Sequence, residues 1–286
     1  MVIFLDYYHP YAGLCNQLYL ITNHLVDAIV NKEYIYINKV NLDIFNKTRV
    51  PAEEFFDLEA TNKNIKKYIG WEPIIYNKPL ENFRVPRLCI YPVGDIYILS
   101  CLEFKEKYKT LLKETYYGIH FRIEFDVIVH YLFSLECYNH FMLNQENLTL
   151  IKPITDYIDY LMDQYKKFIC LFGFKTYFIT FNNSEINKPL KIYLEQLINF
   201  IESGGGKVIT FKPKYQLREL NALRDLLILR DCKKIIGFEG SSFSEGYCKK
   251  YNDAKNRLKD YQFVNGIVTK LNDQLYNNCR SNSSIC

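Results

Sequence analysis

The sequence lacks the features of several large protein classes. It has no apolar stretch of the roughly 18 to 20 residues that crosses a bilayer, and its longest near-apolar run covers residues 168 to 174, so we expect no membrane span. It has one Trp but 25 Tyr and 20 Phe. We attribute that aromatic content to overall composition rather than to binding. A hydrophobic fraction of 49% with 24% charged residues excludes wholesale disorder.

The nine cysteines form no recognisable framework. They are odd in number, include no C-x-x-C pair, and form no Cys/His cluster with metal-ligand spacing, so we predict no metal site. A chain of 286 residues can bury a core without disulfides. Met1 is followed directly by Val2 and further apolar residues, without a charged segment or cleavage site. These features predict a reducing, cytoplasmic location.

No charge of one sign dominates. The chain has 36 Lys and Arg against 32 Asp and Glu, a net charge of +4, and its basic residues are spread along the sequence. A nucleic-acid-binding protein normally concentrates basic residues in a patch or stripe. We therefore expect no nucleic-acid partner.

Short apolar runs alternate with amphipathic stretches of helical length, a pattern typical of an α/β protein with parallel sheets. Residues 2–5, 14–30 and 34–37 predict a strand, a helix and a second strand, which together form a βαβ unit. Residues 41–92 contain many prolines and predict irregular connections. Residues 102–113 predict a charged helical linker.

A second α/β series begins near residue 116. It predicts strands near 117–123, 176–180, 207–211 and 234–237, separated by helices near 126–144, 154–168, 189–203 and 217–231. The glycines at 204–206 are expected to stop one of these helices. We predict two domains, 1–113 and 114–286. In such sheets, ligands bind beyond the carboxyl ends of the strands.

The segment from Gly118 to Asp126 has the pattern H-x-R-x-E-x-D. Alternation with a period of two would place His120, Arg122 and Glu124 on one face of a strand and the apolar residues between them on the other. One interpretation is a strand with a solvent-exposed face. In a parallel sheet covered on both faces, however, such groups must be paired or bind a ligand. Arg suits bidentate phosphate recognition.

A buried strand near 234–237 leads into a Gly/Ser turn and a helix start. The turn contains Gly240, Ser241, Ser242 and Phe243. Backbone N–H groups and hydroxyls at a helix N-terminus can bind an anion, although ordinary helix capping would explain the same residues. Upstream, Asp225 lies off a stripe of leucines, and it is either a solvated surface group or a ligand contact.

A third segment, Gly13, Asn16 and Gln17, lies between the first predicted strand and helix. Gly allows a close backbone approach, and the amide side chains both donate and accept hydrogen bonds. A purely structural role is the alternative.

The three segments together resemble the GDP-fucose-dependent fucosyltransferases. The resemblance consists of an early G-x-x-N-Q, a central H-x-R, and a late D-x-x-x-L followed by a strand and G-S-S-F-S, in order across most of the chain. The H-x-R-x-E-x-D form is most similar to the plant-type branch that resembles protein O-fucosyltransferases. The tail from Asp225 is also similar to the α1,2-fucosyltransferases.

The resemblance implies a GT-B-like fold of two Rossmann-like halves with a cleft between them. Residues 1–113 would be the acceptor side, and residues 114–286 would bind the nucleotide sugar. It implies an inverting, metal-independent transfer of fucose from GDP-fucose to a hydroxyl of a glycan or protein acceptor, with no cofactor besides the donor. Secretory-pathway members typically have a leader, a membrane anchor and a disulfide-rich layout, and we expect none of these here.

The resemblance also implies roles for individual residues. Arg122 would contact the β-phosphate, and Asn16 would reach the diphosphate. Ser241 to Phe243 would bind phosphate and nucleoside, and Asp225 would face the nucleotide. The predicted catalytic residues are Arg122, His120, Glu124 and Asp126, and the predicted donor-binding residues are Gly13, Asn16, Gln17, Asp225, Gly240, Ser241, Ser242 and Phe243.

An inverting displacement needs a base near the acceptor hydroxyl. The candidates are Glu124, Asp126 and Glu239, in that order, with Asp6 or His9 as further possibilities. The alternatives to a fucosyltransferase are a glycosyltransferase with another nucleotide sugar and a catalytically silent nucleotide-sugar-binding protein. A hydrolase or P-loop kinase is disfavoured, because the sequence has neither G-x-S-x-G nor G-x-x-x-x-G-K-[ST].

Overall fold

The structure is a computed structural model of the chain. It describes residues 1–6, 13–43, 48–79, 81–85, 95–109, 116–134, 152–182 and 188–266. His9 and the predicted helical residues 135–144 lie outside the described residues.

The chain divides into two compact units. The first unit comprises Met1–Lys113, Lys212–Asp231 and Ser242–Leu258, and the second comprises Glu114–Phe211, Cys232–Ser241 and Lys259–Cys286. The first segment of the first unit ends at residue 113. The structure differs from the prediction further on, because two segments of the predicted domain 114–286 belong to the first unit.

The first unit contains a four-stranded sheet of order β3-β2-β1-β4. Strand β1 is parallel to β2 and β4, and β2 is antiparallel to β3. Its elements are β1 (Val2–Asp6), α1 (Leu14–Val30), β2 (Tyr34–Asp43), β3 (Thr48–Pro51), α2 (Ala52–Phe55), α3 (Leu58–Ile69), β4 (Phe83–Arg84), α4 (Ile96–Cys101), the 3-10 helix η1 (Glu106–Tyr108), α8 (Arg218–Asp231), the π-helix η4 (Ser242–Lys249) and α9 (Lys250–Ala254). The predicted βαβ unit is confirmed as β1, α1 and β2.

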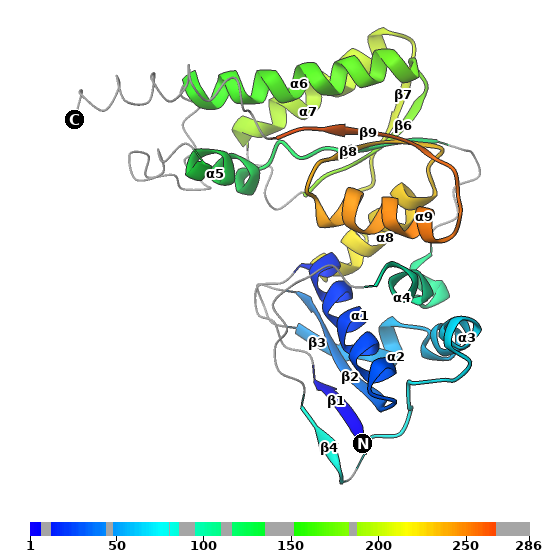
Figure 1. The fold of residues 1–286 in the computed structure, drawn as a ribbon. Helices are drawn as coiled ribbons and strands as arrows, with labels where there is room; N and C mark the ends of the chain where they lie inside the picture. The colour runs from blue at the N-terminus through cyan, green and yellow to red at the C-terminus, as the bar shows by residue number, and fades with distance from the viewer. Residues whose placement is uncertain are drawn as a thin grey trace, which may run out of the picture. The chain divides into compact units, whose positions relative to one another are not determined.

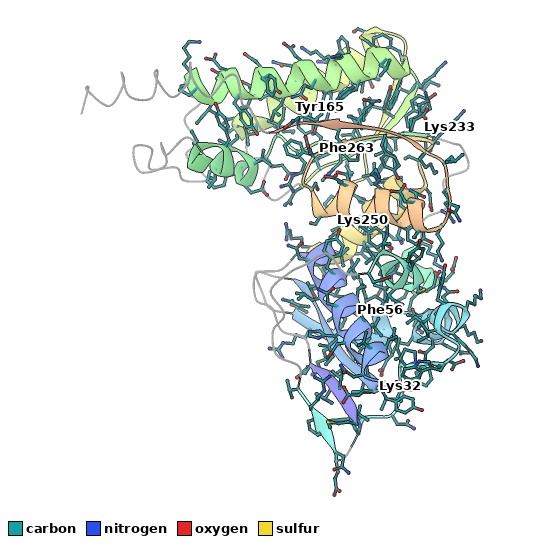
Figure 2. All side chains as sticks on the ribbon, in the orientation of Figure 1. Lys32, Phe56, Tyr165, Lys233, Lys250 and Phe263 are labelled. Atoms are coloured by element: carbon teal, nitrogen blue, oxygen red, sulfur yellow. The ribbon has the colours of Figure 1, made fainter. Side chains whose placement is uncertain are left out.

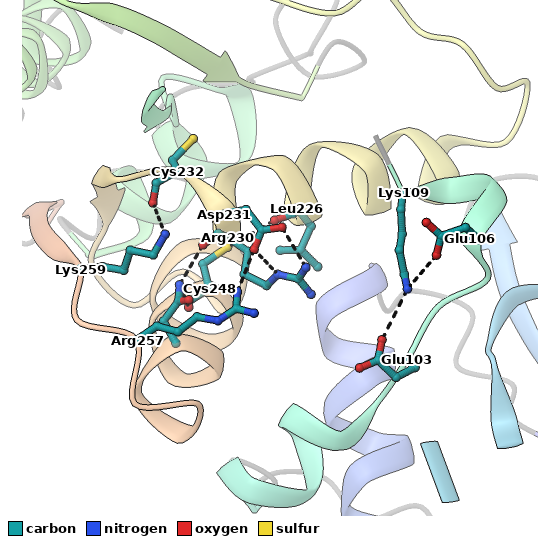
Figure 3. A network of polar contacts seen from close by, with 11 residues as sticks. Glu103, Glu106, Lys109, Leu226, Arg230, Asp231, Cys232, Cys248, Arg257 and Lys259 are labelled. Carbon is teal, nitrogen blue, oxygen red and sulfur yellow. Dashed lines mark hydrogen bonds and ion pairs between the residues drawn. The ribbon is translucent and has the colours of Figure 1, made fainter. Parts of the chain in front are cut away.

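Residues 212–231 and 242–258 of the first unit contact each other, although they are separated in the sequence. Arg257 forms an ion pair of 3.1 Å with Asp231 at the end of α8. The Cys248 thiol donates to the Leu226 carbonyl at 3.7 Å (Figure 3). The side-chain amide of Asn252 donates to the Arg230 carbonyl at 2.9 Å. These contacts pack η4 and α9 onto α8.

The second unit is built on a five-stranded sheet of order β7-β6-β5-β8-β9, and every neighbouring pair is parallel. Its elements are β5 (Tyr117–His120), α5 (Phe125–Ser134), α6 (Lys152–Phe172), β6 (Thr176–Thr180), α7 (Lys188–Ser203), β7 (Lys207–Ile209), β8 (Lys234–Phe238) and β9 (Asp260–Val264). Helices α6 and α7 lie on one face of this sheet (Figure 1). Of the helices in the described ranges, none has the length and apolar character needed to cross a membrane.

Several local predictions are confirmed and others are wrong. Helix α7 ends just before the predicted glycines, and Gly205 takes φ 87°, a left-handed value that favours glycine. Strand β5 ends at residue 120, not 123. In the described part of the predicted linker helix 102–113, only the short helix η1 forms. Helices α3 and α4 and strand β9 were not predicted.

Candidate active site

The two central strands of the second unit end at a topological switch point. From β5 the chain continues to β6 and β7 on one side, whereas β8 pairs with the other side of β5 and is followed by β9. In open parallel sheets, ligands bind at this point, outside the carboxyl ends of the strands. Here the segment 121–124 follows β5, and the turn 239–241 follows β8. Two of the segments predicted to bind the ligand therefore leave adjacent strand ends.

A buried tyrosine holds the chain where β5 ends. The Tyr165 hydroxyl donates to the His120 carbonyl at 2.8 Å and accepts the Arg122 backbone N–H at 3.0 Å. Burial raises the pKa of Tyr165 far above its ordinary value, so the hydroxyl stays protonated. The residue points from α6 toward the sheet (Figure 2). One side chain thus fixes the backbone on both sides of Phe121.

This bridge leads to a testable expectation for Tyr165→Phe. Removing the hydroxyl leaves the Arg122 N–H without that acceptor, and we expect a loss of about 1 kcal/mol in the free energy of unfolding. Hydrogen exchange at the Arg122 amide should become faster. Tyr177→Phe is a matched control, because Tyr177 is also buried and donates to the Gly173 carbonyl at 2.8 Å. It should lower stability without accelerating exchange at Arg122. Unchanged exchange in Tyr165→Phe would contradict the bridging role.

The Arg122 guanidinium is held by two carboxylates. It forms ion pairs of 3.2 Å with Glu124 and 2.6 Å with Asp126. The Arg122 side chain keeps 24% of its surface exposed, so a ligand can still reach it. These contacts place a planar, permanently charged group just beyond the end of β5.

Glu124 connects this Arg to the neighbouring strand. Its Oε1 accepts the backbone N–H of Asn182, two residues after β6, at 2.7 Å, while its Oε2 faces Arg122. Glu124 is fully buried. The solvent-exposed strand that the alternation allowed is therefore wrong, because Arg122 and Glu124 follow the strand and the row of ionisable groups is paired.

His120 is the last residue of β5 and is buried. Burial, with a smaller effect from the Arg122 charge, lowers the pKa of His120 well below its usual value. The imidazole is therefore neutral near pH 7. In the H-x-R pair, the permanent positive charge belongs to Arg122.

The turn after β8 is shaped by Gly240. This residue has φ 74°, which a residue with a side chain rarely adopts. The Ser241 N–H donates to the Phe238 carbonyl at 3.2 Å, and the Glu239 N–H donates to the Val264 carbonyl of β9 at 3.0 Å. Glu239 is exposed.

The G-x-x-N-Q segment lies in the first unit, at the start of α1. Gly13 is the N-cap residue. The buried Gln17 side chain donates to the Asn41 carbonyl at 2.8 Å and accepts the Asn41 N–H at 3.1 Å, a structural pairing. Asn16 is half-buried. The backbone N–H of Leu14, in the first turn of α1, donates to the buried carboxylate of Glu219 at 2.8 Å.

Three more predicted residues belong to the first unit. Asp225 on α8 forms an ion pair of 2.7 Å with its neighbour Arg224. Ser242 and Phe243 begin η4, and the Tyr19 hydroxyl of α1 donates to the Ser242 carbonyl at 3.2 Å. The structure thus groups His120, Arg122, Glu124, Asp126, Gly240 and Ser241 in the second unit, and Gly13, Asn16, Gln17, Asp225, Ser242 and Phe243 in the first.

Comparison with solved structures finds the same fold. A crystal structure of POFUT1, a protein O-fucosyltransferase, in complex with GDP matches with a TM-score of 0.57 and 12% sequence identity. The match covers 92% of this chain and 97% of POFUT1. A POFUT1 complex with GDP-fucose matches with a TM-score of 0.55, the same identity and the same coverage. The chain has a GT-B-like α/β fold. That prediction is confirmed.

At 12% identity, this likeness establishes the fold and leaves the residue roles as predictions. No protein-family model matches the sequence, and no curated protein sequence matches it. Functional roles for the residues after β5 and β8 must therefore be argued from the contacts within this chain.

Sequence reasoning missed three residues that shape these segments, namely Tyr165, Asn182 and Glu219. Tyr165 looks like any apolar-face residue of α6, and Asn182 contributes a backbone N–H, which carries no sequence signal. Glu219 was overlooked, although an acidic residue beside a leucine stripe is a visible oddity.

Proposed function

We propose that this protein is an inverting glycosyltransferase that moves fucose from GDP-fucose to a hydroxyl of a glycan or protein acceptor. The observation that carries the proposal is the position of Arg122. Its guanidinium is held at the carboxyl end of β5, beside the strand that leads into the Gly240–Ser241 turn. The same fold carries GDP-fucose in the POFUT1 complexes.

The chemistry explains the need for a fixed cation. In the transfer, the bond between the sugar anomeric carbon and the β-phosphate oxygen breaks, and its electron pair leaves with GDP. The acceptor oxygen forms the new bond on the opposite face, and its proton passes to a base. Negative charge grows on the diphosphate, so a preorganised Arg with nearby N–H and hydroxyl donors stabilises the transition state more than the ground state.

Exposure separates the candidate bases. Glu124 is buried, and both of its oxygens face partners within the protein. Asp126 retains 36% of its side-chain surface, and Glu239 is exposed. A base must reach the acceptor hydroxyl directly or through one water. Within this proposal, Asp126 and Glu239 suit the base, and Glu124 suits a supporting role.

The arrangement also favours a transfer without a divalent metal. The acidic pair Glu124 and Asp126 is already neutralised in part by Arg122, at 3.2 and 2.6 Å. A metal ion at these carboxylates would face the guanidinium charge at close range, which is strongly unfavourable. Arg122 supplies the positive charge that a metal would otherwise contribute.

We therefore expect GDP and GDP-fucose to raise the melting temperature equally with EDTA and with added manganese or magnesium. Ligand binding to the folded state stabilises it by mass action, whatever the source of the affinity. Differential scanning fluorimetry at a fixed ligand concentration measures the shift. A shift that disappears in EDTA and returns with manganese would contradict the metal-independent proposal.

The donor is tested by incubating the purified protein with GDP-fucose, GDP-mannose and UDP-sugars and following release of free nucleotide. We expect GDP-fucose to be hydrolysed fastest, because slow transfer to water uses the same bond cleavage. Faster hydrolysis of another sugar nucleotide would identify a different donor. Tight GDP-fucose binding without hydrolysis or transfer would support the catalytically silent binding protein instead.

A further inference from the structure

The two carboxylates that hold Arg122 differ in burial and in the backbone donor that each accepts. Glu124 is buried, and the Asn182 N–H fixes its second oxygen at 2.7 Å. Asp126 is 36% exposed and lies in the first turn of α5, where its Oδ1 accepts the Val127 N–H at 2.7 Å. Glu124 cannot move without leaving a backbone donor unsatisfied. The carboxylate of Asp126 is partly exposed, so it can turn from Arg122 toward solvent.

We propose that Glu124 is the fixed support of Arg122, whereas Asp126 occupies the position of the ligand's anion and is displaced by a phosphate oxygen. This inference rests on the proposed function only for the identity of the ligand as a nucleoside diphosphate. Glu124 is a positioning residue that acts through Arg122. Asp126 is an internal competitor of the ligand's phosphate for Arg122, and its displacement frees a carboxylate beside the reacting atoms.

Electrostatics supports this division. The cluster has one guanidinium and two carboxylates, and an incoming phosphate adds further negative charge beside Asp126. A phosphate that contacts Arg122 would lie next to the Asp126 carboxylate, and like charges in contact repel strongly in a partly buried site. A diphosphate offers the guanidinium the same two-oxygen geometry as a carboxylate, with more charge. Replacing Asp126 by a phosphate at Arg122 therefore costs less free energy than replacing the buried Glu124.

The proposal predicts opposite effects for two conservative variants. We expect Glu124→Gln to weaken GDP binding about tenfold, because the Gln oxygen can still accept the Asn182 N–H but no longer anchors the guanidinium. We expect Asp126→Asn to strengthen GDP binding severalfold, because the competing charge is removed. Isothermal titration calorimetry of the full chain with GDP, and separately with inorganic pyrophosphate, measures both.

A double-mutant cycle separates positioning from a general structural effect. In an Arg122→Ala background, Glu124→Gln should no longer weaken GDP or pyrophosphate binding, because no guanidinium remains to be positioned. A purely structural role of Glu124 would lower the affinity in both backgrounds. The melting temperature of each variant without ligand confirms that the protein compared is folded.

The outcomes distinguish this inference from the proposed function. If the parent binds GDP and both variants change affinity in the same direction, the inference is overturned and the proposed function stands. If the parent binds pyrophosphate but not GDP and the variants differ in sign, the inference stands and the GDP-sugar proposal fails. Binding of neither probe by the folded parent overturns both.

Discussion

Arg122→Ala is expected to slow fucose transfer by about 100- to 1000-fold, which corresponds to roughly 3 to 4 kcal/mol of transition-state stabilisation. In the proposed function, the guanidinium at the end of β5 stabilises the charge that develops on the departing diphosphate. The fold should survive, because the Arg122 side chain is partly exposed and its backbone is held by Tyr165. Steady-state transfer or donor hydrolysis measures the effect, with a melting curve on the same sample.

Arg122→Lys is the finer test of the same idea. Lys retains the positive charge but lacks the planar fork that contacts two oxygens at once. We expect only partial recovery of the rate. Recovery to the parent rate would show that charge alone suffices at this position.

Arg84 supplies a matched control within the same chain. It also forms ion pairs with two carboxylates, 2.7 Å from Asp27 and 2.6 Å from Glu33, and its side chain is 35% exposed. Arg84→Ala removes the same kind of group from the first unit, far from β5 in the sequence, and should leave turnover unchanged. If Arg122→Ala and Arg84→Ala reduce the rate equally, the catalytic role of Arg122 is refuted.

Gly246→Ala is expected to destabilise the protein by about 2 to 3 kcal/mol, through overpacking. Gly246 is a buried residue of η4, and a Cβ added there would fall on the Tyr19 side chain of α1. To make room, the Tyr19 ring must shift, and its hydroxyl would lose the hydrogen bond to the Ser242 carbonyl. Chemical denaturation followed by circular dichroism measures the loss.

Gly13→Ala is the control for this substitution. A Cβ at Gly13 has open space around it, and its φ of −61° is ordinary for any residue. Replacing an N-cap Gly by Ala should lower stability by about 0.5 to 1 kcal/mol, less than the loss expected at position 246. Equal losses for the two variants would show that the close contact with Tyr19 is not what requires glycine at position 246.

Hydrophobic periodicity predicted most of the regular elements. Strand β6 and the helices α1, α7 and α8 fall within a residue or so of the predicted bounds. These elements have a strong period because one face of each is buried in the core. Strand β9 was missed, although residues 260–264 alternate, since five residues next to a charged stretch give a weak signal.

The predicted helix over 102–113 and the predicted extension of β5 to Ile123 are wrong for different reasons. In the described part of 102–113, the buried residues Leu102, Phe104 and Tyr108 pack in short irregular turns, so tertiary burial overrides helical propensity. Beyond His120, the alternation continues in the sequence although the strand has ended. Phe121 and Ile123 are buried there by packing in the loop, and the charged residues by pairing.

The local sequence determined most of the secondary structure, the α/β class and the segments that follow the strands, because these depend on near neighbours and on burial of one face. Tertiary structure alone decided that Glu124 is buried and reaches Asn182, and that α8, η4 and α9 pack with the first unit. Those contacts join residues far apart along the chain or depend on the backbone N–H, which every residue except proline carries. No local pattern encodes them.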